Sequence, residues 1–171
     1  ASDPFKQSLF RSDKFRRAMS HLVNRQAVID IVYGGLGTPM YSSVYPVLTQ
    51  WINPRGPKYE YDPQQAAKLL AELGFTKKDR EGYLVDSKGR RIEFNLATNA
   101  GNTQREQIAK LIVDEAKKVG VKVNFQAIDF NTLVGQLLSS GPDRPFDAII
   151  IGLTGGGLDW PFGSNVVPCK G

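Results

Sequence analysis

The chain has 171 residues and a net charge of +5, with 41% hydrophobic and 23% charged residues. These values favour one folded domain with its own core and exclude a disordered or fibrous chain. The longest apolar run, at positions 148–151, is far shorter than the roughly 20 residues of a membrane-spanning helix. Residues 1–5 lack the pattern of a secretory signal, which we expect to be absent or already removed. Cys169 is the single cysteine and cannot form an internal disulfide.

The positive charge is spread over small groups of basic residues, with acidic residues among them. A nucleic-acid-binding face would concentrate lysine and arginine on one element or surface. We therefore expect a solvated surface and no nucleic-acid partner.

The first part of the chain predicts two helices. Apolar residues at positions 15, 18, 19 and 22 have helical spacing, with Ser12 or Asp13 as the N-cap. Asn24 caps the second helix, and Gly34 and Gly35 provide its end. The following segment, 37–58, contains four prolines and no helical period, which predicts an extended, irregular chain.

A third helix is predicted after Asp62, which is its N-cap, with Pro63 at its first position and Gly74 at its end. Residues 83–86 and 91–97 flank a turn and predict a hairpin.

The last third predicts the order strand, helix, strand, helix, strand. Strands end at Ala97, cover 121–126 and cover 146–152, and the helices run from about Asn102 to 119 and from the cap Asp129. Their expected inner faces are, for the first helix, Ile108, Leu111, Ile112 and Val119, and for the second, Phe130, Leu133, Val134, Leu137 and Leu138. This order predicts the α/β class, with a helix-covered, largely parallel or mixed sheet. Residues 1–171 form a single lobe, in which 1–11 and 160–171 are expected connectors.

No metal or cofactor site is predicted. His21 is the one histidine, and a single His and a single Cys cannot supply the ligands of a zinc site. The glycine-rich run 152–160 lacks the spacing of nucleotide-binding motifs.

Ligands of open α/β sheets bind outside the carboxyl ends of the strands. This rule selects the loops 98–102, 128–130 and 152–160. The candidate ligand-binding residues in the first and last of these loops are Thr98, Asn99, Thr154, Gly155, Gly156, Asp159 and Trp160. The alternative is that the small and polar residues only turn the chain and that Trp160 belongs to the core.

Several segments are similar to one known family. They are FRRAM at 15–19, NRQAV at 24–28, GGLGTP at 34–39, YEYDP at 59–63 and LGF at 73–75. Together with the hairpin region and 108–123, they resemble the family 5 solute-binding proteins of ABC importers, the oligopeptide-, dipeptide- and nickel-binding group.

The resemblance implies a binding protein, not an enzyme, with two lobes that enclose a small solute. This chain would be the second lobe, its connectors would lead to the first lobe, and an oligopeptide or dipeptide would be delivered to an ABC permease in the membrane. It also implies a periplasmic or extracellular location and leaves membrane anchoring of the full-length protein open.

One departure concerns the ligand. Peptide binders of this family follow the last strand with Gly-Trp and an Asp for the peptide amine, whereas here Leu153 and Thr154 follow Gly152. Either Asp159 substitutes from a longer loop or the solute is not a peptide, since other members bind sugars or metal chelates. Two further alternatives remain: a stand-alone α/β enzyme using Asp129, Asp159 and Lys170 as acid or base, or another ligand-binding or regulatory module.

Overall fold

The computed structural model of the chain describes residues 3–42, 44–139 and 144–152. The elements, in chain order, are α1 (Pro4–Arg11), α2 (Asp13–His21), α3 (Arg25–Val32), the 3-10 helix η1 (Thr49–Trp51), α4 (Pro63–Glu72), β1 (Lys77–Lys78), β2 (Leu84–Val85), β3 (Glu93–Asn99), α5 (Thr103–Val119), β4 (Lys122–Ile128), α6 (Phe130–Leu138) and β5 (Ala148–Ile149).

The main sheet has three parallel strands in the order β4-β3-β5. Strand β3 is central, pairs with β4 from Glu93↔Lys122 to Asn99↔Ile128, and pairs with β5 at Leu96↔Ala148 and Ala97↔Ile149. Helix α5 connects β3 to β4, and α6 lies between β4 and β5 in the chain. The predicted strand–helix order and the parallel α/β sheet are confirmed, although β5 is shorter than the expected strand at 146–152.

Each α-helix begins at a side chain that accepts a backbone N–H of the first turn, which replaces a bond that the helix itself cannot make. Asn24 accepts from the N–H of Ala27 at 2.9 Å, and Asp62 accepts from the N–H of Gln65 at 2.9 Å. The remaining caps are Asp3, Ser12, Asn102 and Asp129. The caps predicted at Asn24, Asp62 and Asp129 are confirmed, and Ser12 is the one chosen over Asp13.

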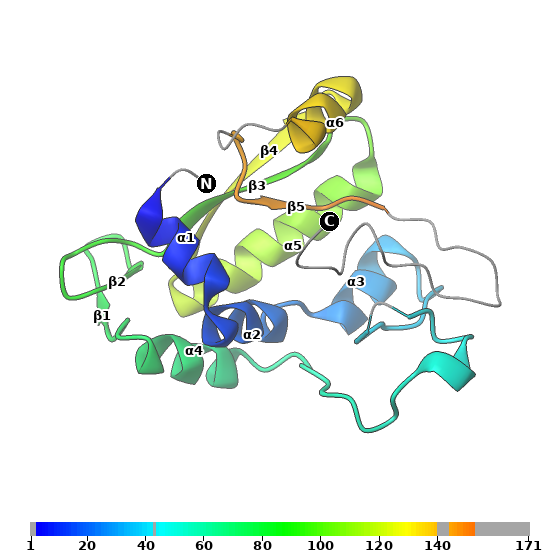
Figure 1. Cartoon of the computed structure of the whole chain (residues 1–171), viewed down its shortest axis with the longest axis horizontal. Coiled ribbons are helices and arrows are strands. Elements are labelled where there is room, and N and C mark those ends of the chain that lie inside the picture. The colour runs from blue at the N-terminus through cyan, green and yellow to red at the C-terminus, as the bar shows by residue number, and fades with distance from the viewer. Residues whose placement is uncertain (1–2, 43, 140–143, 153–171) are drawn as a thin grey trace.

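Helices cover both faces of the sheet (Figure 1). On one face, α1, α2, α4 and α5 enclose the larger core, in which Phe15, Leu70, Ile92 and Val121 are fully buried. On the other face, Leu133 of α6 packs with Ala97 of β3 and with Phe146. The sheet therefore lies between two separate cores.

The buried faces of α5 and α6 agree with the predicted ones only in part: Ile112 and Val119 of α5 and Leu133 and Leu137 of α6 pack on the cores. In α5 the buried residues are Ala109 and Ala116, while Ile108 is only partly buried. Alanine leaves space for the helix backbone to approach the sheet, so the larger side chains lie beside the contact. In α6 the expected inner residues Phe130 and Leu138 are 50% and 77% exposed. These two residues are the first and the last of α6, whereas the buried Leu133 lies near its middle.

The N-terminal segment forms a helix packed on the core, although the sequence suggested only a connector there. Leu9 of α1 is buried, and the Lys6 ammonium lies 2.8 Å from the carboxylate of Asp147, just before β5. Lys6 and Asp147 are 141 positions apart, so only the folded chain brings them together. That residues 1–11 and 160–171 lead towards a first lobe stays a prediction.

The predicted hairpin is present mainly as a turn. Asp86 accepts backbone N–H groups from Lys88 and Arg90, and a single bridge joins Val85 to Arg91. Strand β2 pairs instead with β1, which the sequence did not predict. The hairpin predicted from 83–86 and 91–97 is therefore present only next to its turn, because residues 93–99 pair with β4 and β5 instead.

Candidate functional site at the carboxyl edge of the sheet

Strands β3, β4 and β5 end at one edge, because parallel strands end on the same side of their sheet. The backbone N–H of Ala100, after β3, donates to the carbonyl of Ile128 at 2.7 Å. The hydroxyl of Thr98 donates to the carbonyl of Ile150 at 2.9 Å. These two bonds connect the β3 loop to the other two loops. The predicted convergence is confirmed for the ends of the three strands, whereas residues 153–160 of the third loop lie outside the described residues.

Thr98 has no exposed surface, although it was predicted to bind ligand. Its hydroxyl is satisfied by Ile150, so its observed contribution is to position the chain that leaves β5. A direct contact between Thr98 and a solute stays a prediction. Asn99, in contrast, is partly exposed and its carboxamide oxygen accepts from Arg105 Nη1 at 2.6 Å.

Arg105 is a site residue that the sequence analysis missed. It lies in the first turn of α5, and its guanidinium passes directly over Gly152, where a Cβ would overlap it. Arg105 therefore connects the end of β3, through Asn99, to the chain after β5. A cation in the first turn of a helix is unfavourable for the helix dipole. An arginine at this unfavourable position of the helix was the signal in the sequence that Arg105 interacts with residues outside α5.

Five of the predicted ligand-binding residues lie outside the described residues. They are Thr154, Gly155, Gly156, Asp159 and Trp160. Their membership of the site therefore stays a prediction, based on the position of Gly152 at this edge.

The loop 128–130 contributes an ionised cap. The Asp129 carboxylate accepts from the backbone N–H of Thr132 at 3.0 Å and from its hydroxyl at 3.1 Å. These bonds, the backbone one first, lower the pKa of Asp129 below its ordinary value. The hydrogen bonds that lower this pKa are those of a helix cap, so the observed role of Asp129 is to begin α6.

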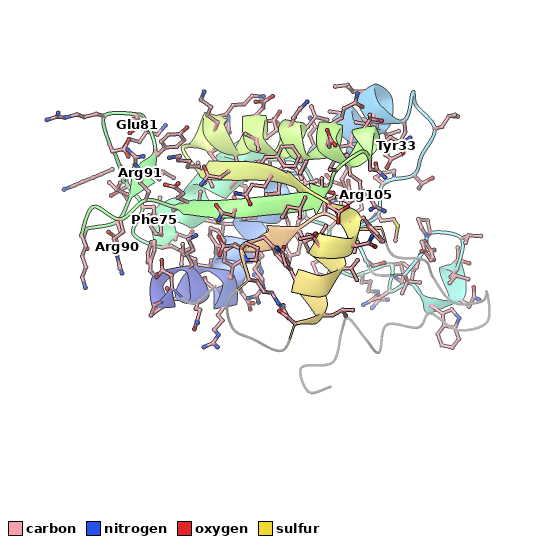
Figure 2. All side chains as sticks on the ribbon, turned by 90° about the horizontal axis from the view of Figure 1, so that it is seen from above. Tyr33, Phe75, Glu81, Arg90, Arg91 and Arg105 are labelled. Carbon is pink, nitrogen blue, oxygen red and sulfur yellow. The ribbon has the colours of Figure 1, made fainter. Side chains whose placement is uncertain are left out.

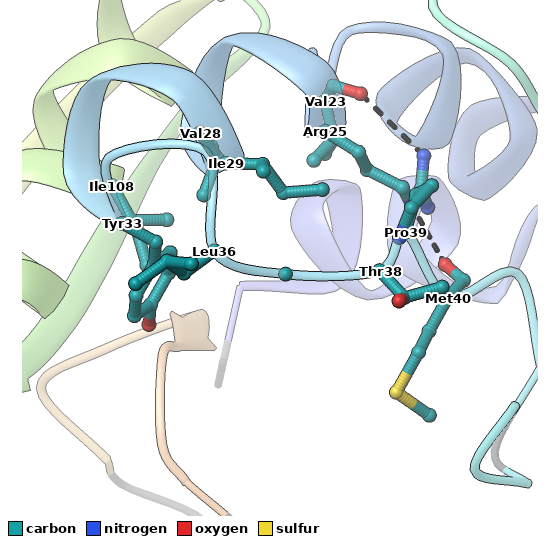
Figure 3. A pocket seen from close by; sticks show the side chains of 11 residues that line it. Val23, Arg25, Val28, Ile29, Tyr33, Leu36, Thr38, Pro39, Met40 and Ile108 are labelled. Atoms are coloured by element: carbon teal, nitrogen blue, oxygen red, sulfur yellow. Dashed lines mark hydrogen bonds between the residues drawn. The ribbon is translucent and has the colours of Figure 1, made fainter. Parts of the chain in front are cut away.

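An apolar groove of about 390 Å³ lies beside this edge, between α3, its exit turn and α5 (Figure 3). Its lining consists of Val23, Arg25, Val28, Ile29, Tyr33, Leu36, Gly37, Thr38, Pro39, Met40 and Ile108. Ile108 follows Arg105 by three residues on α5, so the two side chains are neighbours on the helix surface. The groove and the polar edge are therefore adjacent.

Within residues 3–42, 44–139 and 144–152, no three His, Cys, Asp or Glu side chains gather in a way that could hold a metal ion. No helix in the same ranges is both long and apolar enough to cross a membrane.

Removing the Thr98 hydroxyl tests the link between the strand ends. Thr98→Val keeps the side-chain shape but leaves the Ile150 carbonyl without its donor, which should cost about 1–3 kcal/mol of unfolding free energy. Thr98→Ser retains the hydroxyl and should lose less. Urea denaturation of both variants measures the difference, and equal losses would contradict a positioning role for the hydroxyl.

The parallel sheet and its covering helices define an α/β lobe, and comparison with known proteins identifies its family. The pattern described as "Bacterial extracellular solute-binding proteins, family 5 Middle" matches residues 4–167. The chain belongs to this family.

Three relatives illustrate the similarity. A probable ABC transporter-binding protein of Deinococcus radiodurans is 56% identical over 99% of this chain and 29% of its own length. The oligopeptide-binding protein AppA of Bacillus subtilis is 33% identical over 86% of this chain and 27% of its own length. The heme-binding protein A of Haemophilus influenzae is 31% identical over 67% of this chain and 19% of its own length. The chain thus spans less than a third of each relative.

The structure of AppA in complex with a nonapeptide superimposes with a TM-score of 0.73 and 32% identity, over 84% of this chain and 28% of AppA. The fold is therefore that of part of a family 5 solute-binding protein. The predicted family and fold class are both confirmed.

Proposed function

We propose that this chain forms one wall of the solute site in the substrate-binding protein of an ABC importer. The observation that carries the proposal is the convergence of three strand ends at the carboxyl edge, through the Thr98–Ile150 and Ala100–Ile128 bonds. Such an edge is where open α/β folds bind their ligands. Partly exposed Asn99 and Arg105 supply polar groups there, and the adjacent groove supplies apolar surface.

A second lobe would close the site. The relatives are more than three times as long as the aligned part of this chain, which leaves room for one. One edge of a sheet covers only one side of a solute, so the first lobe of the same protein would supply the other side. The closed form of the protein, with the solute between its two lobes, would then be the form that an ABC permease recognises. Periplasmic or extracellular placement follows from the family description, and membrane anchoring would depend on parts of the whole protein beyond this chain.

A peptide is the solute that we propose. AppA, at 32% identity, was solved with a nonapeptide. Another relative is named for heme binding, so the family's fold accommodates different solutes. The carboxyl edge offers donors and acceptors suited to a peptide backbone, namely the Arg105 guanidinium and the Asn99 carboxamide.

A thermal-unfolding screen of the whole protein tests this function. A solute present at 100 times its dissociation constant should stabilise the folded protein by about 2.7 kcal/mol. We expect stabilisation by short peptides and none by heme, oligosaccharides or nickel chelates. Stabilisation by heme, oligosaccharide or chelate alone would contradict the proposal that the solute is a peptide. No stabilisation by any solute would contradict solute binding itself.

Two variants test whether the peptide that stabilises the protein binds at the carboxyl edge. Asn99→Ala should reduce the peptide-induced shift, because Asn99 is partly exposed at the carboxyl edge and holds Arg105. Arg80→Ala changes an exposed residue in the turn between β1 and β2 and should leave the shift unchanged. Equal shifts for Asn99→Ala and the unaltered protein would place the solute elsewhere.

A further inference from the structure

Residues 31–54 are the longest uncharged stretch of the chain, with no Asp, Glu, Lys, Arg or His between Asp30 and Arg55. Charged residues make up 23% of the whole chain, so a solvated segment of this length is expected to carry several. The stretch instead contains three of the chain's six tyrosines, together with Trp51 and Met40. Depletion of charge and enrichment of aromatic residues and methionine are typical of the centre of a protein–protein interface.

Much of this stretch is exposed in the structure. Leu36 is 84% exposed and Val47 is 72% exposed. Single exposed apolar side chains are normal, whereas a concentration of them marks a surface that something else covers. We call the described residues of 31–54 the uncharged surface. Of the nine large apolar or aromatic side chains that are exposed among the described residues, six belong to it, namely Ile31, Tyr33, Leu36, Tyr45, Val47 and Trp51.

The uncharged surface has a defined shape, because its middle is fixed to the start of α3. Arg25 donates to the carbonyl of Met40 at 2.9 Å, and its guanidinium lies over the Tyr41 ring, 4.8 Å from the ring centroid. The N–H of Leu48, just before η1, donates to the carbonyl of Tyr45 at 2.9 Å. Leu48 is buried but belongs to neither core of the sheet. The surface is therefore ordered by its own contacts, outside the two cores.

Hollows in the uncharged surface offer places for the side chains of a partner. The groove of about 390 Å³ lies between α3, residues 36–40 and α5, and a second hollow of about 180 Å³ lies between residues 39–46 and 52–58. Side chains that fill such hollows supply most of the binding energy of an interface. Figure 1 shows α3 and η1 at the same end of the molecule. Figure 2 shows Tyr33 near that end and the charged Glu81, Arg90 and Arg91 at the opposite end.

The composition indicates a cover that is always present. Interfaces that form and separate are about as polar as the rest of a protein surface, whereas permanent interfaces are more apolar. A part of the same polypeptide is present at an effective concentration in about the millimolar range, so it covers the surface at all times. The relatives from Deinococcus radiodurans and Bacillus subtilis have more than two thirds of their length outside the part that matches this chain. That length is enough for a covering domain.

We infer that the uncharged surface is a permanent contact with the first lobe of the same protein, covered in the open form as well as in the closed form. This inference rests on the proposed function for the existence of that lobe. The position of the groove selects the first lobe as the cover. Ile108 lines the groove one helical turn after Arg105, whose guanidinium lies over Gly152 at the carboxyl edge. A lobe that closes over the carboxyl edge therefore lies next to the groove.

Cysteine labelling of the whole protein without solute tests whether the surface is covered. Leu36→Cys and Val47→Cys are made separately in a background without other cysteines, which includes Cys169→Ser. Leu138→Cys is the control, because Leu138 is 77% exposed and belongs to α6. A covered thiol reacts only after local opening, so maleimide should label positions 36 and 47 at least about tenfold more slowly than position 138. Each rate is divided by that of the same variant unfolded in urea. Similar rates at all three positions would overturn the inference.

Photo-cross-linking identifies the cover. The photo-reactive residue p-benzoylphenylalanine replaces Val47 or Leu36 in the whole protein, and mass spectrometry identifies the linked peptide. We expect a link within one polypeptide to a segment outside residues 1–171. A link to residues 153–171, a link to a second copy of the protein, or no link from either position would overturn the inference. Neither measurement uses a solute, so a failure of solute binding and a failure of this inference are distinguishable.

Discussion

Phe15→Ala is expected to lower the unfolding free energy by about 3–5 kcal/mol, the usual loss for a buried phenylalanine. The ring of Phe15 has no exposed surface and connects three elements. It meets Phe10 of α1 edge-on at 5.3 Å between ring centroids, and Phe94 of β3 edge-on at 6.4 Å. Alanine would leave a cavity where α1, α2 and β3 meet. Urea denaturation provides the measurement.

Phe130→Ala is the matched control, because it removes the same ring from a site that is 50% exposed. Its loss should not exceed about 1 kcal/mol, since little apolar surface returns to water. Similar losses for the two variants would mean that α2 does not form the core described for this fold.

The second large effect is expected from Asp147→Ala, at about 3 kcal/mol of unfolding free energy. The Asp147 side chain is 5% exposed and accepts from Lys6 Nζ at 2.8 Å and from the Asn95 N–H at 2.9 Å. Alanine leaves the Lys6 ammonium, 24% exposed, without its partner, and unpaired buried charges cost about 3–5 kcal/mol. Partial exposure of Lys6 places the expected loss at the lower end. Differential scanning calorimetry measures it.

Asp13→Ala provides the comparison, because Asp13 pairs with Arg16 at a site where the carboxylate is 69% exposed. Exposed ion pairs contribute about 0–1 kcal/mol, so this variant should unfold close to the unaltered protein. Asp147→Asn keeps an acceptor for the Asn95 N–H and should retain part of the stability. Were Asp147→Ala as mild as Asp13→Ala, the attachment of α1 to the sheet through Lys6 would be refuted.

Only part of the candidate site could be predicted from the sequence. The rule that parallel strands end at one edge correctly placed the ends of β3 and β4 together, and Asn99 lies at that edge, whereas its contact with a solute stays a prediction. Thr98 illustrates the limit of the rule, because its side chain turns inward to Ile150. Which neighbour a side chain faces depends on the register of β3 against β5, and the sequence does not contain that register.

Arg105 and the groove escaped prediction for a related reason. The groove needs α3 and α5 in contact, and Ile29 and Ile108 lie far apart in the chain. Helical periodicity placed Ile108 on the inner face, whereas the structure uses Ala109 and Ala116 for the contact with the sheet. Ile112 and Val119 pack on the core as predicted, and Ile108 lines the groove instead.

What the sequence by itself determined is local: the caps at Asn24, Asp62 and Asp129, the helix end at Gly74 with its φ of 93°, and the strand–helix order that requires parallel strands. Each depends on interactions within a few residues, so composition and spacing suffice to find it. Tertiary structure alone decided the burial of α1, the Lys6–Asp147 ion pair and the adjacency of Arg105 to Gly152. These features join distant segments, and their geometry is set only when the helices settle on the sheet.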